Sequence, residues 1–169
     1  MFERTIRDVG RYFEAAGLGF VFRAVRRIRV VNEESYHDSR NNTIGLRPAD
    51  LKKPYAAFHR QPYLLIHELG HQFAELCLTS ADKKALEPLF GDYDAPYRRA
   101  PRPRACGPDH VSRYAMVHPV EDFTETFAVC LWRDWEPEAV RRLLGARGPR
   151  CRRKAAAVSR IIDRERRKR

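Results

Sequence analysis

The residues most suited to chemistry lie in the pentapeptide HELGH at residues 67–71. Residues four apart lie one turn above each other on a helical face, so the imidazoles of His67 and His71 can bind one metal ion. An imidazole pair at this spacing suits Zn²⁺. Glu68 lies one step round the helix, where its carboxylate can accept a proton from a water on the metal. The motif therefore predicts a zinc site that activates water.

The surroundings of the motif favour this interpretation over a helix with two ordinary histidines. The motif lies in the apolar run YLLIHELGHQFAELCL, which follows Pro62. Proline suits the first turn of a helix because its missing N–H would have no partner there. Two imidazoles and a carboxylate are costly to bury in such a helix unless they bind a metal or are hydrogen-bonded. We expect a metal-binding helix from Pro62 to about Leu78.

A second acidic segment, HPVEDFTETFA, offers the third ligand. One HExxH pattern places a histidine six residues after the second motif histidine and a glycine three residues after it, but here Cys77 and Ala74 occupy those positions. The acidic segment instead places Glu121 and Glu125 four residues apart on one helical face. We predict Glu121 as the third ligand and Glu125 as a hydrogen-bond acceptor for a ligating imidazole.

Other residues stay open for these roles. Asp122 and Glu75 are the alternatives for the ligand and its hydrogen-bonding neighbour, and glutamate pairs on helices are also common as solvated surface acids. His118 precedes Pro119 and is interpreted as a helix N-cap, with the third ligand as its alternative role. The remaining histidines have no partner at metal-binding spacing and are interpreted as surface or packing residues: His37, His59 and His110.

Together the two motifs resemble those of known metallopeptidases. HELGH, a later tyrosine and HPVEDFTETFA are similar to the anthrax-lethal-factor-like peptidases. They are also similar to a group of bacterial zinc-binding metallopeptidases of the gluzincin type, with a second motif HPxEDFAETxA. The resemblance covers roughly residues 43–132, and its second motif is the more specific one. Thr124 departs from the alanine that is usual at its position.

The resemblance implies roles for single residues. It implies that Glu121 is the zinc ligand, and that Glu125 lies next to the ligands without binding the metal itself. Tyr114, seven residues before Glu121, is implied to donate a hydrogen bond to the oxyanion, whereas the residue alone would favour a packing role. The strand at residues 43–46 is similar to the edge strand that pairs with an extended peptide substrate.

The remaining elements complete an α+β fold. Apolar spacing predicts a first helix from Phe2 to Gly17. Ile28–Val31 is a predicted strand, and Ser35–Asp38 and Thr43–Leu46 form a predicted hairpin around the turn Ser39–Asn42. Further predicted helices are Lys83–Phe90, Pro119–Trp132, Pro137–Gly145 and a basic helix after Pro149, and Gly91–His110 is a predicted loop. We expect a zincin-like metallopeptidase domain whose small mixed sheet packs on the active-site helix.

Positive charge is concentrated at the C-terminal end of this 169-residue chain, whose formal net charge is +11. Residues 147–169 hold eleven of the 33 Lys and Arg residues and two of the 22 acidic residues, and so contribute +9. We predict a metallopeptidase domain at residues 1–146 and a basic C-terminal helix or tail at 147–169. A solvated end is the simplest interpretation. Clustered cations also bind nucleic-acid phosphates or an acidic protein, although no aromatic residues are interleaved for base stacking.

The sequence predicts a cytoplasmic protein without a membrane span. It lacks a run of about 18 apolar residues, and Leu18–Phe22 is too short for the apolar core of a signal peptide. Secretion without such a signal would leave no trace in the sequence. The four cysteines show no CxxC spacing and are predicted to be reduced thiols, with Cys77 and Cys130 in the core.

We therefore predict a zinc-dependent peptidase that acts on a peptide or protein substrate, with Glu68 as general base. The alternatives are a regulatory or DNA-associated protease specific for one protein partner, and a non-catalytic zinc-binding protein. A structural zinc site would not need Glu68, so its presence favours catalysis.

Overall fold

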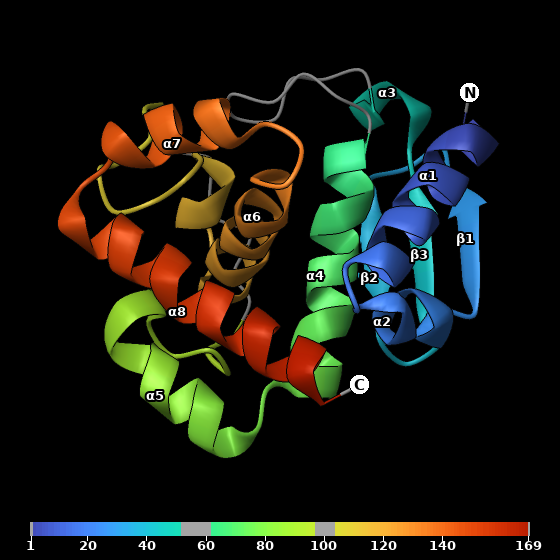
Figure 1. Ribbon diagram of the computed structural model, residues 1–169. Helices are drawn as coiled ribbons and strands as arrows, with labels where there is room; N and C mark the ends of the chain where they lie inside the picture. The colour runs from blue at the N-terminus through green and yellow to red at the C-terminus, as the bar shows by residue number, and fades with distance from the viewer. Residues whose placement is uncertain (1, 52–61, 97–103, 169) are drawn as a thin grey trace. The chain divides into compact units, whose positions relative to one another are not determined.

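The computed structural model describes residues 2–51, 62–96 and 104–168. The chain divides into an N-terminal unit, Met1–Cys77 with Arg164–Arg169, and a helical unit, Leu78–Asp163. The positions of these units relative to one another are not determined, so each is described by itself (Figure 1). Helices together with a small three-stranded sheet confirm the predicted α+β class. The predicted boundary at residues 146/147 coincides with neither boundary between the units.

The N-terminal unit combines the sheet with four helices. Its elements in chain order are α1 (Phe2–Ala15), α2 (Gly19–Ala24), β1 (Arg27–Val30), β2 (Tyr36–Asp38), β3 (Thr43–Leu46), α3 (Pro48–Leu51) and α4 (Pro62–Cys77). The first helix and the motif helix α4 are confirmed, whereas α2 and α3 are additional to the predicted elements. The position of His59 lies outside the described residues.

The first helix ends at a glycine, as predicted. Gly17 has φ +70°, a left-handed conformation that glycine adopts without steric cost. The N–H of Leu18 donates to the carbonyl oxygen of Phe13 at 2.7 Å, the six-residue bond of a Schellman helix end. Leu18 itself is buried. The chain therefore turns sharply into α2 and brings an apolar side chain back to the core.

The sheet is mixed and has the strand order β1-β3-β2. β2 and β3 form the predicted antiparallel hairpin, and β1 runs parallel to β3. Thr43–Leu46 is therefore the central strand, and both of its hydrogen-bonding edges are occupied. Its expected role as the substrate-pairing edge strand is wrong, because pairing between β1 and β3 cannot be read from local sequence. The edge strands are β1 and β2.

One cross-strand row ties the three strands together. Arg29, Gly45 and Tyr36 are aligned in register on β1, β3 and β2. The Tyr36 ring lies across Gly45, and its hydroxyl accepts a hydrogen bond from Arg29 Nε at 3.0 Å. A Cβ on Gly45 would lie 2.4 Å from the Tyr36 ring. Gly45 is therefore needed for the ring to reach across the sheet.

The core of the N-terminal unit forms around α4. This helix contacts α1, α2, α3 and β2. Figure 1 shows α4 running alongside β2, with α1 and α2 in front of the strands. Fully buried apolar side chains come from each of these layers: Val9, Phe13, Val21, Ile44, Leu65, Leu69 and Phe73. The predicted packing of a small sheet on the motif helix is confirmed.

The helical unit is built around α6. Its elements are α5 (Ser80–Phe90), the short 3₁₀ helix η1 (Tyr114–Met116), α6 (Pro119–Trp132), α7 (Pro137–Gly145) and α8 (Pro149–Arg167), whose last turn belongs to the N-terminal unit. The α5 helix begins earlier than predicted because Thr79 and Asp82 form a reciprocal capping box. The described parts of the predicted loop, residues 91–96 and 104–110, contain neither helix nor strand.

The basic C-terminal segment forms α8, and its apolar face is buried. Buried residues recur at helical spacing at Cys151, Ala155, Val158 and Ile162. The thiol of Cys130 in α6 donates to the carbonyl oxygen of Ala155 at 3.4 Å. α8 is therefore part of the core of the helical unit.

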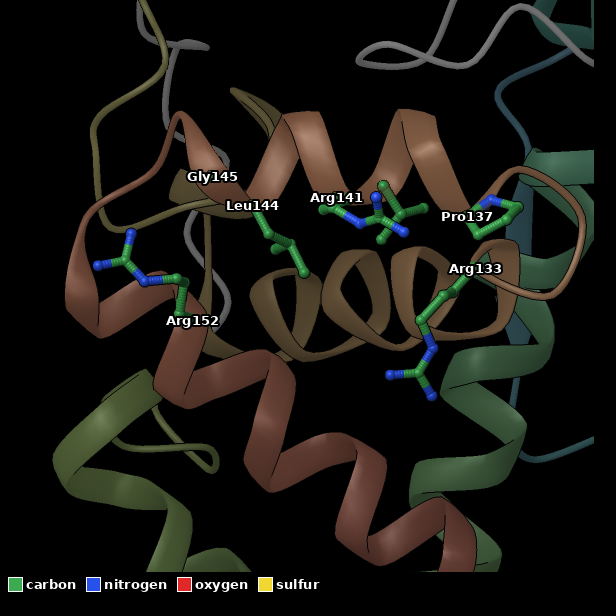
Figure 2. A pocket seen from close by; sticks show the side chains of 7 residues that line it. Arg133, Pro137, Arg141, Leu144, Gly145 and Arg152 are labelled. Atoms are coloured by element: carbon green, nitrogen blue, oxygen red, sulfur yellow. The ribbon is translucent and has the colours of Figure 1, made fainter.

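Exposed arginines gather where the end of α6 meets α7 and α8. A hollow of about 380 Å³ is lined there by apolar side chains, including Val140 and Leu144, and by Arg133, Arg141 and Arg152 (Figure 2). The three arginines come from the end of α6, from α7 and from α8. Of the three, Arg152 belongs to the basic segment 147–169, whose binding of nucleic acid or of an acidic protein stays a prediction.

Among the described residues, no helix is long and apolar enough to cross a membrane. The four cysteines are free thiols, and Cys77, Cys130 and Cys151 are buried. Burial raises the pKa of the Cys130 and Cys151 thiols to about 11. The prediction that Cys77 and Cys130 lie in the core is confirmed.

Substitution on the buried face of α8 should destabilise the fold. Ile162 is 2% exposed, so Ile162→Ala should lower the free energy of unfolding by about 2–5 kcal/mol. Arg160→Ala, at an exposed position two residues away, should change it by less than about 0.5 kcal/mol. Denaturant titration followed by circular dichroism measures both variants. Equal effects of the two substitutions would show that this face does not contribute to the core.

Candidate metal site

The predicted zinc residues of the first motif meet on α4. One ligand atom from each of His67, Glu68 and His71 lies within 4.8 Å of the others. The His67 and His71 rings are 5.1 Å apart between centroids and nearly perpendicular, at 81°. Two imidazoles and one carboxylate so close together fit the donor preferences of Zn²⁺. The described part of the chain contains no other group of this kind.

The site residues lie on a helix that is buried on most sides. His67 is 2% exposed and Glu68 is 4% exposed, while His71 is half-buried. Leu65, Ile66 and other apolar neighbours occupy the rest of this stretch of α4 and are fully buried. Burial in apolar surroundings strengthens electrostatic interactions, so charges at this site act strongly on one another.

The edge strand β2 adds a histidine, His37, whose spacing in the sequence predicts only a surface or packing role. The His37 ring lies parallel to that of His71, with centroids 5.9 Å apart. Its Nε2 is hydrogen-bonded to Gln72 Oε1 at 2.8 Å, and its Nδ1 is 4.0 Å from Glu75 Oε1. Burial lowers the pKa of His37. Sequence spacing carries no signal for this neighbour, because β2 and α4 are distant in the chain.

The second motif begins α6 as the sequence predicts. His118 is the N-cap: its Nδ1 accepts a hydrogen bond from the N–H of Val120 at 3.2 Å, and Pro119 occupies the first turn. The His118 Nε2 is 3.0 Å from the carbonyl oxygen of Ala95. Both ring nitrogens are therefore engaged in structural hydrogen bonds, which confirms the N-cap interpretation over the ligand alternative.

Three acidic side chains on the first two turns of α6 are buried. Glu121 is 5% exposed, Asp122 is 1% exposed and Glu125 is 0% exposed. Charged carboxylates are buried only where cations, metals or hydrogen-bond donors compensate for lost water. The interpretation of Glu121 and Glu125 as solvated surface acids is therefore wrong. These residues and α4 belong to different units, and coordination by Glu121 stays a prediction.

The environment of Asp122 is defined by neighbours within the helical unit. Burial raises the pKa of this carboxyl to about 7, and the ammonium of Lys154 opposes the rise. The Asp122 Oδ2 accepts a hydrogen bond from Lys154 and lies 3.5 Å from His110 Nε2. Burial, reinforced by Lys154, lowers the pKa of His110 to about 4, so this imidazole is neutral at pH 7. Asp122 is thus committed to structural contacts and is a poor alternative to Glu121.

Tyr114, the predicted oxyanion donor, begins η1 and is half-buried. This short helix contacts α6 within the helical unit. Glu75, the other alternative, lies on α4 with 43% of its side chain exposed and is absent from the three-residue group. The structure therefore brings His67, Glu68 and His71 together, and places Tyr114, Glu121 and Glu125 in the other unit.

Comparison with known proteins supports the metal assignment. Residues 63–135 match the model of a family described as "putative zinc-binding metallo-peptidase". The matched segment includes both HELGH and HPVEDFTETFA, and extends over α4, α5 and α6. No curated protein and no solved structure matches the chain. The family match and the ligand group on α4 share the HELGH motif, and both point to zinc.

Loss of either motif imidazole should remove the metal. His67→Ala and His71→Ala should each reduce bound zinc well below one ion per chain, because the site loses a nitrogen ligand. His37→Gln removes a neighbouring imidazole outside the ligand group and should leave zinc content unchanged. Elemental analysis of the purified, dialysed proteins measures this. Zinc retained by both alanine variants would rule out the site on α4.

Proposed function

We propose that this protein is a zinc-dependent peptidase of the gluzincin type that hydrolyses peptide bonds in a peptide or protein substrate. The observation that carries the proposal is the meeting of His67, Glu68 and His71 ligand atoms within 4.8 Å on a buried helix. The match of residues 63–135 to a zinc-binding metallopeptidase family supports it. The presence of Glu68 between the two histidines favours catalysis over a purely structural zinc site, which would not need this carboxylate.

The proposed ligands are His67, His71 and Glu121, with Glu125 as the hydrogen-bond partner that orients the ligands. Complete burial of Glu125 and near-complete burial of Glu121 support these roles, because buried carboxylates need cations or donors around them. Their four-residue spacing on α6 places both on one helical face. Three protein ligands leave one coordination position for water, as catalytic zinc sites require.

The chain's own groups move the protons. Zinc, when bound, supplies a Lewis acid that acidifies water and polarises the substrate carbonyl. Glu68 accepts a proton from the attacking water and passes it to the leaving amine nitrogen. The Tyr114 hydroxyl donates a hydrogen bond to the carbonyl oxygen as that atom becomes negative. The buried position of Glu68 excludes bulk water from the carboxylate that carries the proton.

Two more specific versions of this function differ only in their substrate. The cationic face around Arg133, Arg141 and Arg152 provides a contact surface for nucleic acid, and would suit a protease that acts on DNA-associated proteins. A regulatory protease with a single protein partner would use the same catalytic residues. Both versions require the activity that the following experiments test.

Replacement of the general base should separate catalysis from metal binding. Glu68→Gln keeps the size of the side chain but cannot accept a proton, so cleavage should fall by about 10²–10⁴-fold while zinc content stays near one per chain. Cleavage is measured on a peptide library by mass spectrometry, and zinc by elemental analysis. Glu87→Gln, at an exposed position on α5, is the matched control and should behave like wild type. Undiminished cleavage by Glu68→Gln would remove the enzymatic proposal.

The two glutamates of α6 should differ in their effect on zinc affinity. Loss of an outer hydrogen-bond partner costs about 10–100-fold in metal affinity, so Glu125→Gln should fall in that range. Glu121→Gln removes a ligand and should weaken zinc binding further. Competition with a chromophoric chelator gives both dissociation constants. A larger effect at Glu125 than at Glu121 would exchange the two roles, and no effect at either would place the third ligand elsewhere.

A further inference from the structure

A buried lysine joins α8 to the start of α6. Lys154 is 2% exposed, and its Nζ donates to Asp122 Oδ2. The same Nζ donates to the carbonyl oxygen of Asp109 at 2.9 Å and lies 5.3 Å from the centroid of the Phe90 ring. Two acceptors and an aromatic face thus replace the water that a lysine ammonium loses on burial.

Stability alone does not explain this ion pair. Both side chains are 2% exposed, so each has lost nearly all its hydration. Desolvation of that kind consumes much of the attraction, and buried ion pairs replaced by apolar residues of similar volume are often neutral or stabilising. An ion pair differs from apolar packing in being directional. Its contribution here is therefore best sought in the geometry it imposes on α6.

The geometry concerns the proposed zinc ligand. Asp122 follows Glu121 directly in the first turn of α6, so its side chain points about 100° away around the same helix. Holding the Asp122 carboxylate on Lys154 fixes the rotation of this turn about its axis, and the direction of Glu121 follows. His118 fixes the start of the same turn from its own side through its contact with Ala95.

The charge balance of α6 points the same way. Its first two turns carry three buried carboxylates, those of Glu121, Asp122 and Glu125. Lys154 brings a buried positive charge next to the middle one. The attraction of Lys154 for Asp122 sets this middle carboxylate apart from the two that are proposed to support zinc.

We propose that Lys154 is a positioning residue of the zinc site, which orients Glu121 by holding Asp122 in the first turn of α6. The inference rests on the proposed function, because it assumes that Glu121 binds zinc. It assigns part of the basic C-terminal segment to the catalytic site, where Lys154 acts through Asp122 without touching the substrate.

Removal of both charges, those of Lys154 and Asp122, separates an effect on the orientation of Glu121 from an effect on the stability of the fold. Lys154→Met alone leaves Asp122 buried without its ammonium, so the apo protein should melt at a lower temperature. The double variant Lys154→Met/Asp122→Asn lacks both charges of this ion pair, so neither has to be desolvated, and it should recover the melting temperature of wild-type apo protein. Its zinc affinity should nevertheless be about 10-fold or more weaker, as for other residues that support ligands. Lys154→Arg, which retains the charge, should restore part of the affinity.

Zinc affinity is measured by chelator competition and apo stability by thermal denaturation, so neither readout requires turnover. Arg153→Met, at an exposed position one residue away on α8, is the matched control and should change neither quantity. Wild-type zinc affinity in the folded double variant would overturn the positioning role. If Glu121→Gln binds zinc as tightly as wild type, Glu121 is not a ligand and the proposed ligand set is wrong. The inference about Lys154 then fails because of the ligand set, which distinguishes this outcome from the preceding one.

Discussion

The structure depends on the burial of ionisable side chains in two apolar helices. α4 and α6 each carry functional groups, yet residues 121–132 of α6 are buried throughout, as is most of α4. A charged or polar group in such a place has to meet a metal, a counter-ion or a hydrogen-bond partner. The neighbouring elements therefore have to supply those partners. The packing of each unit follows from which element supplies the partner of each buried group.

In the N-terminal unit, the sheet supplies partners for the motif helix. His37 on β2 reaches Gln72 on α4, next to the second motif histidine. Its backbone pairs with Ile44 in the hairpin, so its position depends on the register of β2 against β3. The register of the sheet therefore determines this contact, because a slip of one residue would turn the imidazole away from α4.

In the helical unit, the N-terminus of α6 is held from two directions. His118 caps the helix and contacts Ala95, and Lys154 from α8 binds Asp122. The contacts of His118 with Ala95 and of Lys154 with Asp122 each join segments more than 20 residues apart in the chain. The carboxylates of Glu121 and Glu125 then project from a turn whose rotation and starting point are both set. A preorganised ligand requires little rearrangement when a metal binds, which favours affinity.

Local chemistry explains which features were accessible from the sequence. Pro62, Pro119 and Pro137 mark helix starts because proline is favoured in the first turn, and the spacing of His67 and His71 fixes their common face. The edge-strand role expected of Thr43–Leu46 was wrong, because the pairing of β1 with β3 makes this strand central and is not visible in local sequence. Lys154 was hidden for a similar reason, since its partner Asp122 lies 32 residues earlier.

The C-terminal segment shows how net charge can conceal a core element. Its positive charge suggests a solvated end, yet Cys151, Ala155, Val158 and Ile162 repeat with the period of a buried helical face. The sequence shows this apolar spacing, but it does not indicate whether Lys154, which lies between these residues, is solvated or buried. Only its partner decides, because a lysine ammonium enters a core when acceptors are already in place. The carboxylate of Asp122 therefore determines that Lys154 belongs to the interior, and with it the side of α8 that faces α6.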